Sequence, residues 1–212
     1  MEKNNGVSSA VIRRLPRYYR YLGELQSHGI NRISSKELAE KMNLTASQIR
    51  QDLNCFGGFG QQGYGYNVES LKSEICKILG LDNEFNAVLV GVGNLGHAFA
   101  QHIDFKGAGF NLIAAFDLNP ELIGKKVGKI EIIDFNKIKD FCKNNRVDIA
   151  VLCVPKAAAN HVAETFIECG VSSFWNFTYE DISVGHPDII VENVHLGDGL
   201  MTLCYRINDA KK

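Results

Sequence analysis

The first part of the chain carries apolar residues at the spacing of amphipathic helices. Over residues 8–28 they recur at every third or fourth position, which places them on one face of a helix that ends at Gly29. Pro16 has no backbone N–H to donate, so we expect a helix start or a kink there. The predicted apolar face consists of Leu15, Tyr18, Tyr19, Leu22 and Leu25.

Two short helices are predicted next, over 35–42 and 46–55, with only residues 43–44 between them. Two capped helices joined by a tight turn form a helix-turn-helix. The cap signals are a polar residue and its partner three positions later, Ser34 with Glu37 and Thr45 with Gln48. The residues expected to pack the two helices together are Leu38, Ala39, Leu44, Ile49 and Leu53.

The second of these helices presents polar side chains in its first turns. In a helix-turn-helix that contacts DNA, this part of the helix faces base edges in the major groove. An ordinary helical hairpin with a solvated polar face is the alternative interpretation. The candidate DNA-binding residues on this helix are Ser47, Gln48, Arg50 and Gln51.

Charge is unevenly distributed along the chain. Residues 1–53 carry nine Lys and Arg against five Asp and Glu, whereas the other residues carry fourteen against nineteen. A basic N-terminal segment on a mildly acidic body indicates a nucleic-acid-binding module attached to a second domain.

Glycines alternate with aromatic residues over 56–66. Tyr64 and Tyr66 alternate as in a strand, and the glycines indicate a tight hairpin. A hairpin after a helix-turn-helix is a wing, which lies along the phosphate backbone or in the minor groove. A helix over 68–79 then closes the module, and residues 80–86 form a polar linker. The wing residues expected to contact DNA are Gln61, Gln62 and Tyr64.

From residue 87 onward, short apolar strands alternate with helices. Nearly continuous apolar strands in such an alternation indicate a parallel sheet covered by helices on both faces. The strands are predicted at 87–90, 112–116, 130–133, 149–154, 173–176 and 189–194. The helices are predicted at 95–105, 136–144 and 157–169, with a last amphipathic helix at 196–208.

A glycine-rich motif follows the first of these strands and opens a helix, which is the context of a dinucleotide-binding fingerprint. Gly91 permits the turn, Gly93 lets a pyrophosphate approach the backbone, and Gly96 allows close helix–strand packing. Asp117 ends the next strand, 21 residues after Gly96, where it can hydrogen-bond an adenosine ribose and repel a 2′-phosphate. The motif therefore favours NAD(H) over NADP(H), and a tight turn without a ligand is the alternative. Its residues are Gly91, Val92, Gly93, Asn94, Leu95 and Gly96.

Two more strand ends are expected at the same carboxyl edge of the sheet, where ligands bind in such folds. Val154 and Pro155 end one strand, and Asn176 and Phe177 end the next. We expect these four residues to form apolar and hydrogen-bonding walls around nicotinamide. Packing at a strand end is the alternative for each of them.

Several other functions are disfavoured by what the sequence lacks. Only a short tail follows the last strand, and no His–Asp or Ser–Tyr–Lys pattern supplies an acid or base, so we expect no catalytic residue. The six cysteines show no CxxC pair and no zinc-ligand spacing, which indicates reduced thiols and no metal, with a thiol-based redox switch as the alternative. No apolar run approaches the ~20 residues of a membrane span, and no signal peptide is evident, so we expect a cytoplasmic protein.

Several segments together carry a resemblance to a known family. They are RRLPRYYRYL, SSKELAEKMNLTASQIRQDL, FGGFG with GYGYNV, LVGVGNLGHAFA, AAFDLNPELIGKKVG, VPKAAA and WNFT, and they span nearly the whole chain. On these segments the chain resembles the redox-sensing transcriptional repressors of the Rex family. The resemblance implies an α/β protein that forms a homodimer. It would consist of a winged helix-turn-helix DNA-binding domain over 1–80, a Rossmann NAD(H)-binding domain over 85–195, and a C-terminal helix over 196–212 that is exchanged between subunits.

The resemblance also implies a repressor that leaves double-stranded operator DNA when NADH binds, whereas NAD⁺ is compatible with the DNA-bound state. Arg20 corresponds to an arginine at the family's interface between the two domains. This chain departs from many members at His102 and His195, where they have a tyrosine and an aspartate, so their Tyr–Asp–Arg relay cannot be transferred unchanged. Gln61 and Gln62 stand where many members have basic wing residues.

Two other functions stay open. The first is a small NAD-dependent oxidoreductase, against which the missing catalytic domain counts. The second is a CoA-binding module, because the related domain of succinyl-CoA synthetases has similar glycine-rich and WNFT-like segments. The basic helix-turn-helix and Asp117 favour the repressor.

Overall fold

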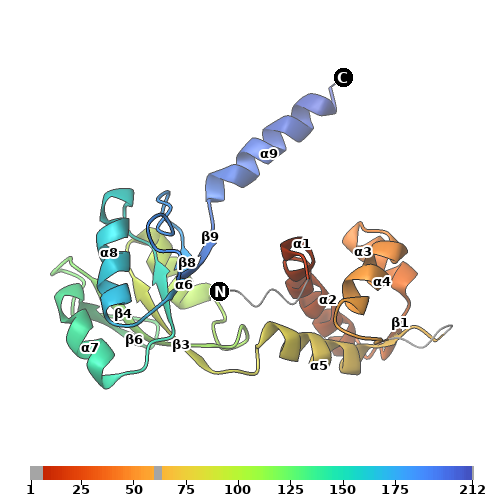
Figure 1. The fold of residues 1–212 in the computed structure, drawn as a ribbon, viewed down its shortest axis with the longest axis horizontal. Helices are drawn as coiled ribbons and strands as arrows, with labels where there is room; N and C mark the ends of the chain where they lie inside the picture. The colour runs from red at the N-terminus through yellow and green to blue at the C-terminus, as the bar shows by residue number, and fades with distance from the viewer. Residues whose placement is uncertain (1–6, 60–63, 212) are drawn as a thin grey trace. The chain divides into compact units, whose positions relative to one another are not determined.

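The computed structural model describes residues 7–59 and 64–211 of the chain. The chain divides into two compact units, Met1–Asn83 and Glu84–Lys212 (Figure 1). The division falls within the segment that the sequence predicts as a linker. None of the helices in the described part of the chain has the length and apolar character needed to cross a membrane.

The first unit is helical and contains a small two-stranded sheet. The segment predicted as helical over 8–28 forms two helices, which confirms the helix start expected at Pro16: the chain turns at Arg13 and Arg14, and Pro16 lies in the first turn of the second helix. The elements are α1 (Ser9–Ile12), α2 (Leu15–Ser27), β1 (Arg32–Ile33), α3 (Ser35–Met42), α4 (Ala46–Asn54), β2 (Tyr66–Asn67) and α5 (Val68–Leu79).

The helix-turn-helix of α3 and α4 forms as predicted, and both N-cap side chains accept the expected hydrogen bond. The reciprocal bond of a capping box forms at Ser34, whereas at Thr45 the Gln48 side chain binds Asp52 instead. Ser34 Oγ accepts from the Glu37 N–H at 3.1 Å, and Glu37 Oε2 accepts from the Ser34 N–H at 2.8 Å, which completes a capping box. These bonds hold the pKa of the Glu37 carboxyl below its usual value. Thr45 Oγ1 accepts from the Gln48 N–H at 3.1 Å at the start of α4. Asn43, with a φ of 53°, makes the left-handed turn between the helices.

The strand of the wing pairs differently from the prediction. β2 runs antiparallel to β1, with Tyr66 opposite Ile33, so its partner precedes the helix-turn-helix. The prediction that this strand pairs within a hairpin of residues 56–66 is therefore wrong, because its partner is β1. Gly65 is required next to this pairing, because its φ is +69° and a Cβ atom there would lie 2.6 Å from the Ile33 carbonyl oxygen.

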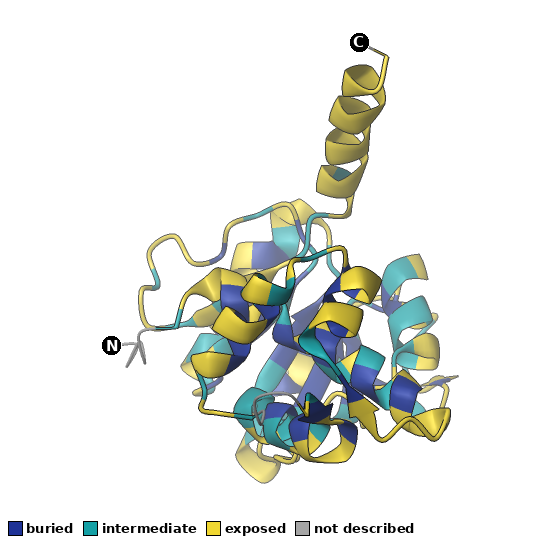
Figure 2. Cartoon of the chain, turned by 90° about the vertical axis from the view of Figure 1, so that its right-hand side faces the viewer, coloured by how far each residue is buried: buried dark blue, intermediate teal, exposed yellow. Residues whose placement is uncertain are grey.

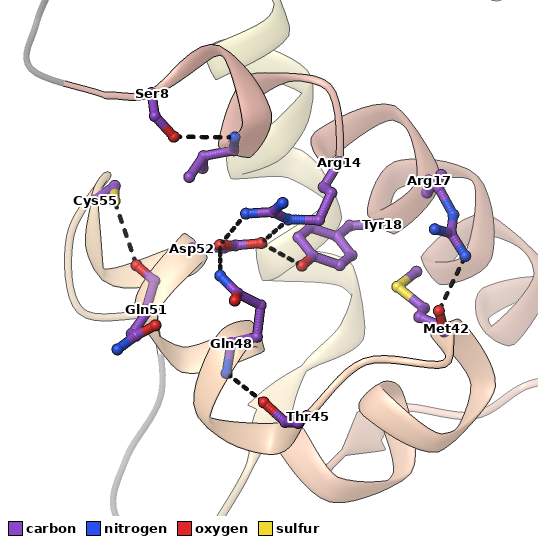
Figure 3. A network of polar contacts seen from close by, with 11 residues as sticks. Ser8, Arg14, Arg17, Tyr18, Met42, Thr45, Gln48, Gln51, Asp52 and Cys55 are labelled. Atoms are coloured by element: carbon purple, nitrogen blue, oxygen red, sulfur yellow. Dashed lines mark hydrogen bonds and ion pairs between the residues drawn. The ribbon is translucent and has the colours of Figure 1, made fainter.

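A buried carboxylate, Asp52 of α4, lies in the core of the first unit and is 0% exposed (Figure 3). Arg14 donates to it through two parallel bonds, from Nε to Oδ2 at 2.6 Å and from Nη2 to Oδ1 at 2.8 Å. The Tyr18 hydroxyl donates to Oδ2 at 2.6 Å, and Gln48 Nε2 donates to Oδ1 at 2.8 Å. Four donors therefore fill the acceptor capacity of the carboxylate.

These hydrogen bonds keep Asp52 ionised in spite of its burial. Burial by itself raises the pKa of Asp52, but the bonds from Arg14, Tyr18 and Gln48 outweigh it and hold this pKa below its usual value. Burial and the neighbouring Asp52 carboxylate in turn raise the pKa of Tyr18, so the phenol stays a hydrogen-bond donor. Since Arg14 and Tyr18 belong to the start of α2, the cluster ties α2 to α4.

The second unit is built on a seven-stranded sheet with the strand order β5-β6-β4-β3-β7-β8-β9. All neighbouring strands are parallel except the edge strand β5, which is antiparallel to β6. The strands are β3 (Phe85–Val90), β4 (Phe110–Asp117), β5 (Lys126–Val127), β6 (Ile130–Asp134), β7 (Ile149–Leu152), β8 (Ser173–Asn176) and β9 (Ile190–Asn193). The helices are α6 (Asn94–His102), α7 (Ile138–Asn144, preceded by a 3₁₀ turn at Phe135–Lys137), α8 (Lys156–Glu168) and α9 (Leu196–Asp209).

Helices cover both faces of this sheet, as predicted. Val88 of β3 belongs to an apolar core on one face, together with Phe166 of α8. Leu89 belongs to a second core on the other face, together with Phe99 of α6. Right-handed crossovers place the helices on opposite faces of the sheet. The chain adds strands from β3 toward one edge as far as β6, and then returns to β7 and adds strands toward the other edge.

Two predicted elements end earlier in the structure. The helix predicted over 95–105 ends at His102, because Ile103 has an extended backbone. The strand predicted over 149–154 ends at Leu152, so Val154 and Pro155 lie in the connection to α8. The two-residue strand β5 is not predicted at all, since it is too short to show a period.

The last helix, α9, contributes no buried residue (Figure 2). Its large apolar side chains are 48% to 71% exposed. An amphipathic helix whose apolar face lies in solvent is typical of a surface that another chain covers. The exposed residues are Leu196, Leu200, Met201, Leu203, Tyr205 and Ile207.

We expect Asp52→Asn to lower the free energy of unfolding by about 2–4 kcal/mol, because it leaves the Arg14 guanidinium against a neutral amide. The range lies below that of fully buried pairs because the Arg14 side chain is 23% exposed. Since the folded-state pKa of Asp52 is lowered, its stabilisation is complete above the unfolded-state pKa of about 3.9 and is lost as the pH falls through the folded-state pKa. Urea unfolding followed by circular dichroism at pH 7 and pH 3 should show the wild type approaching the variant in acid.

Glu40→Gln, which removes an exposed acid from α3, is the matched control and should change stability by less than about 0.5 kcal/mol. Equal stability of the wild type and Asp52→Asn at pH 7 would contradict this role for Asp52.

Candidate functional site

The outward face of α4 consists of polar side chains. Ser47, Arg50 and Gln51, which the sequence predicts as DNA-binding residues, are exposed on it. Gln48 is half-buried instead, and its amide is bonded to Asp52, so it supports the helix from behind. Asn54 is exposed and completes the face, and its spacing of seven from Ser47 could have revealed it.

Arg50 is held at the junction of the two helices. Its Nη1 donates to Ser35 Oγ at 3.0 Å, at the first residue of α3. Burial raises the pKa of Tyr66 in β2, and the positive charge of Arg50 acts against this shift. The Arg50 side chain thus extends from α4 to the start of α3 and stays exposed to solvent.

The wing carries a cationic residue that the sequence analysis did not single out. The Arg32 guanidinium lies 5.9 Å from the ring centroid of Tyr64, and its Nη1 donates to the Tyr64 carbonyl oxygen at 3.4 Å. Tyr64 itself is 69% exposed. Gln61 and Gln62 lie outside the described residues. Arg32 therefore supplies a positive charge beside Tyr64, whereas the predicted wing residues Gln61 and Gln62 carry none.

In the second unit, Gly91 and Gly96 are required by close backbone packing. Gly91 has a φ of +88°, and a Cβ atom there would lie 2.6 Å from the Cys153 carbonyl oxygen. A Cβ atom on Gly96 would overlap the carbonyl oxygen of Gly91. Gly93, in contrast, is exposed, and a Cβ atom there would meet nothing. The fold does not need a glycine at this position, whereas a ligand approaching the backbone does.

Asp117 anchors the glycine loop. Its Oδ2 accepts from the Val92 N–H at 2.6 Å, and its Oδ1 accepts from the Asn119 N–H at 2.8 Å. The carboxylate is half-exposed at the end of β4, and Gly93 caps the neighbouring helix α6. A free helix N-terminus binds phosphate, and a carboxylate beside it accepts hydrogen bonds from ribose hydroxyls. The loop, Asp117 and the start of α6 therefore have the chemistry of a dinucleotide site.

The other predicted wall residues divide into two kinds. Asn176 is fully buried, and Nδ2 donates to the Glu180 carbonyl and to Asn193 Oδ1, both at 2.8 Å. Its Oδ1 accepts from the Thr178 N–H at 3.0 Å and from the Thr178 hydroxyl at 2.7 Å. With all four bonds made, the Asn176 side chain positions the strand end, and its place in the wall around nicotinamide stays a prediction.

Apolar residues remain beside the loop. A Cβ atom on Gly91 would lie 3.1 Å from Val154 Cγ1, which places this valine against the glycine turn. The Phe177 ring packs edge-on against Phe99 of α6, with centroids 4.4 Å apart. Pro155 is exposed at the start of α8. Val154, Pro155 and Phe177 thus lie at the carboxyl edge where a nicotinamide wall was predicted.

The three predicted switch residues lie in separate surroundings. Arg20 is exposed on α2, and His102 is exposed at the end of α6. His195 precedes α9, where its ring stacks on Tyr179 at a centroid distance of 5.5 Å and its Nδ1 lies 3.7 Å from Asp198 Oδ2. Its Nε2 is buried and has no partner among the described residues.

Metal-binding clusters are not found in residues 7–59 and 64–211: no three or more His, Cys, Asp or Glu side chains gather there as a set that could hold an ion. The six cysteines are all free thiols.

Comparison with families of known proteins matches each unit separately. Residues 6–54 match a family described as "Putative DNA-binding protein N-terminus". Residues 82–179 match the family "CoA binding domain".

Curated relatives and solved structures match nearly the full chain. The redox-sensing transcriptional repressor Rex of Clostridioides difficile is 55% identical over 208 residues, which cover 98% of this chain and 99% of the relative. The Rex repressor of Thermoanaerobacter pseudethanolicus is 53% identical over 209 residues, 99% of this chain and 93% of the relative. A crystal structure of RSP in complex with beta-NAD⁺ and operator DNA matches with a TM-score of 0.89 and 53% identity, covering 97% of this chain and 94% of that one.

A second crystal structure, of RSP in complex with beta-NADH, has a TM-score of 0.88 and 50% identity, covering 97% of this chain and 96% of that one. RSP is described as a Rex-family repressor. Identity above 50% over almost the whole length leaves one conclusion: this chain belongs to the Rex family of redox-sensing transcriptional repressors.

Proposed function

We propose that this chain is a homodimeric, cytoplasmic repressor that binds double-stranded operator DNA and releases it when NADH binds, so that it senses the NADH/NAD⁺ ratio. One observation carries the proposal. The same chain holds a helix-turn-helix with an outward polar face and a glycine loop that is open at Gly93 and anchored by Asp117. Relatives matched over 93% and 99% of their own length support this combination, and both are redox-sensing transcriptional repressors.

The DNA interface is assigned to α4 and the wing. Arg50 can donate two hydrogen bonds to a guanine edge, and Gln51 can pair with adenine. Arg32 and Tyr64 of the wing contact the phosphate backbone, where a cation strengthens binding whatever the base sequence. The buried Asp52 cluster holds α4 in a fixed position against α2, which such contacts require.

The cofactor site is assigned to the glycine loop and Asp117. The N–H groups at the start of α6 bind the pyrophosphate, and the Asp117 carboxylate binds the adenosine ribose. Both redox forms share these parts, so these residues hold NADH and NAD⁺ about equally. NADH and NAD⁺ differ in the nicotinamide ring, which is neutral in one and positively charged in the other.

Discrimination is therefore assigned to the apolar residues at the sheet edge. Val154, Pro155 and Phe177 surround the ring, and a neutral ring costs less to bury among them than a pyridinium does. A ligand shifts a two-state equilibrium only by its differential affinity for the two states. NADH then stabilises an arrangement of the dimer in which the two recognition helices no longer match successive major grooves.

The dimer is assigned to two apolar surfaces of the second unit. One is the exposed face of α9. The other is an apolar cavity of about 330 Å³ on the α6 side of β7, β8 and β9. A second copy covers these surfaces, and α9 is exchanged between the subunits. The cavity lining includes Phe105, Phe110, Val151, Trp175 and Ile190.

Coenzyme A is the second candidate ligand, because residues 82–179 match a CoA-binding family. It shares the adenosine diphosphate portion of NAD but carries a phosphate on its ribose. The Asp117 carboxylate, held beside the glycine loop, would repel that phosphate. Asp117 thus favours NAD(H), and titration with both ligands distinguishes them.

We expect Arg50→Ala to weaken operator binding by about 5- to 150-fold, the effect of one lost base contact, without a change in NADH affinity. Operator binding by the wild type should fall steeply with salt, since phosphate contacts release counterions. Lys126→Ala, on the edge strand β5, removes the same charge far along the chain and is the matched control. A gel shift on the DNA upstream of the chain's own gene measures both variants, and an unchanged shift with Arg50→Ala would refute the assignment.

Asp117→Ala should weaken the binding of NADH and of NAD⁺ by similar factors, because the carboxylate is assigned to the adenosine ribose, which both cofactors share. Phe177→Ala should instead change the ratio of the two affinities. Isothermal titrations of both cofactors, and of CoA, measure these effects. Asp117→Asn, which keeps an acceptor for the Val92 N–H, separates loss of ribose binding from loss of loop structure. A selective loss of NADH in Asp117→Ala, or CoA binding tighter than NADH in the wild type, would contradict the site.

Deletion of residues 197–212 should convert the dimer into monomers or aggregates, because it removes the apolar face of α9. The double variant Leu200→Asp/Leu203→Asp tests the same face in the full chain, and Thr202→Asp places a charge on the same helix as a control. Light scattering coupled to size-exclusion chromatography gives the mass of each. A soluble dimer in the deletion variant and in the double variant would rule out α9 as the interface.

A further inference from the structure

Two cysteines from different helices line one surface cavity of the second unit. Cys142 lies on α7, and Cys169 directly follows α8, on the same side of the sheet (Figure 1). The cavity has a volume of about 310 Å³, and both residues are half-exposed. The other lining residues are Lys139, Lys143 and Glu168.

The two thiols are neighbours in this cavity. After burial, the Cys169 thiol is the further cause of the raised pKa of Cys142. Burial and this neighbour raise the pKa of Cys142 to about 12, so Cys142 is held as the protonated partner. Cys142 is therefore a poor nucleophile near neutral pH.

Lysines surround the pair. Lys139 forms an ion pair with Glu168 at 2.7 Å, and this bond raises the pKa of Lys139, to which Cys169 adds a further contribution. Lys139 and Lys143 thus place positive charge in the cavity that the two thiols line.

The other cysteines are placed differently. Cys153 is in apolar surroundings, where burial raises its pKa to about 12. Cys55 follows α4, and Cys204 lies on α9, both exposed. Burial and the neighbouring Cys76 of α5 raise the pKa of Tyr19. Cys142 and Cys169 are thus set apart as two accessible thiols that share one cavity.

We propose that Cys142 and Cys169 are a modification site, a dithiol that low-molecular-weight disulfides oxidise to an intramolecular disulfide between α7 and the end of α8. The Cys169 thiolate attacks one sulfur of the oxidant RSSR, which breaks its S–S bond and releases one RS⁻. Cys142 then loses its proton to solvent and attacks the Cys169 sulfur, which releases the second RS⁻. The two cysteines lose two electrons, and the oxidant leaves as two thiols, RSH, after protonation.

The disulfide closes a loop of chain that passes the carboxyl edge of the sheet. Residues 142–169 contain β7, Val154, Pro155 and all of α8. Cys169 lies about 20 Å along α8 from Pro155, at the usual rise per residue. The disulfide therefore stabilises this unit by restricting its unfolded chain, while the residues at the carboxyl edge stay free.

The experiment exposes the full-length Cys204→Ser chain to oxidised glutathione at pH 8, blocks free thiols with N-ethylmaleimide, and maps tryptic peptides without reduction. Cys204→Ser is needed because trypsin otherwise leaves Cys169 and Cys204 on one peptide. The expected product joins the Cys142 and Cys169 peptides, with a mass lower than their sum by two hydrogen atoms. Dithiothreitol should reverse the link, and the rate of its formation should rise with pH, because the thiolate is the attacking species. The thermal midpoint should rise, with NADH affinity unchanged within about twofold.

Single substitutions test the order of the two steps. Cys142→Ser should stop at a glutathione adduct on Cys169, whereas Cys169→Ser should leave Cys142 unmodified. Cys153→Ser is the control and should still form the link. Recovery of both Cys142 and Cys169 as free thiols after Cys55 has reacted would overturn the proposal, and so would a link from Cys169 to a second copy of the chain.

Discussion

An ionised carboxylate in an apolar core sets the geometry of the DNA-binding unit. Burying the Asp52 charge is costly unless every acceptor site is used, and Arg14, Tyr18 and Gln48 use them all. These donors come from two helices, so α4 has one position relative to α2 in which the charge is satisfied. Arg17 extends the same restraint, because its Nη2 donates to the Met42 carbonyl at the end of α3 at 3.0 Å. Hydrophobic packing alone allows small shifts, whereas a saturated buried charge allows very few.

The nucleotide-binding unit depends on a comparable restraint made by backbone packing. Gly91 and Gly96 let two turns of chain approach more closely than any side chain permits, and Asp117 ties the resulting loop through the Val92 N–H. What these contacts leave open is the backbone at Gly93, at the N-terminus of α6. Two of the three glycines of the motif, Gly91 and Gly96, are therefore required by the packing of the fold, whereas Gly93 is available for a ligand to approach.

Regular features of both units could be predicted from the sequence because their signals are local. The capping box of Ser34 and Glu37 fixes the start of α3, and the glycine motif fixes the start of α6. The Asp52 cluster could not be predicted in this way, because Arg14 and Asp52 are 38 residues apart and only the fold brings them together. The pairing of Tyr66 with Ile33 was missed for the same reason. Asn176 was assigned correctly to a strand end, but its hydrogen bond to Asn193 could not be predicted, because that partner lies 17 residues away on another strand.

The proposed discrimination between NADH and NAD⁺ requires a few residues to supply a large difference in affinity. Moving a two-state equilibrium from 1:99 to 99:1 needs a differential affinity of about 10⁴, and contacts to adenosine and pyrophosphate contribute nothing to it. Only the ring end of the site can supply this difference. There, the Asn176 amide joins the end of β8 to Asn193 at the end of β9, three residues before α9 begins. The end of β8, which Phe177 follows, and the end of β9, which leads to the helix that the proposed dimer exchanges, are therefore joined by a hydrogen bond. This bond gives a shift at the proposed ring end of the site a connection to the base of α9.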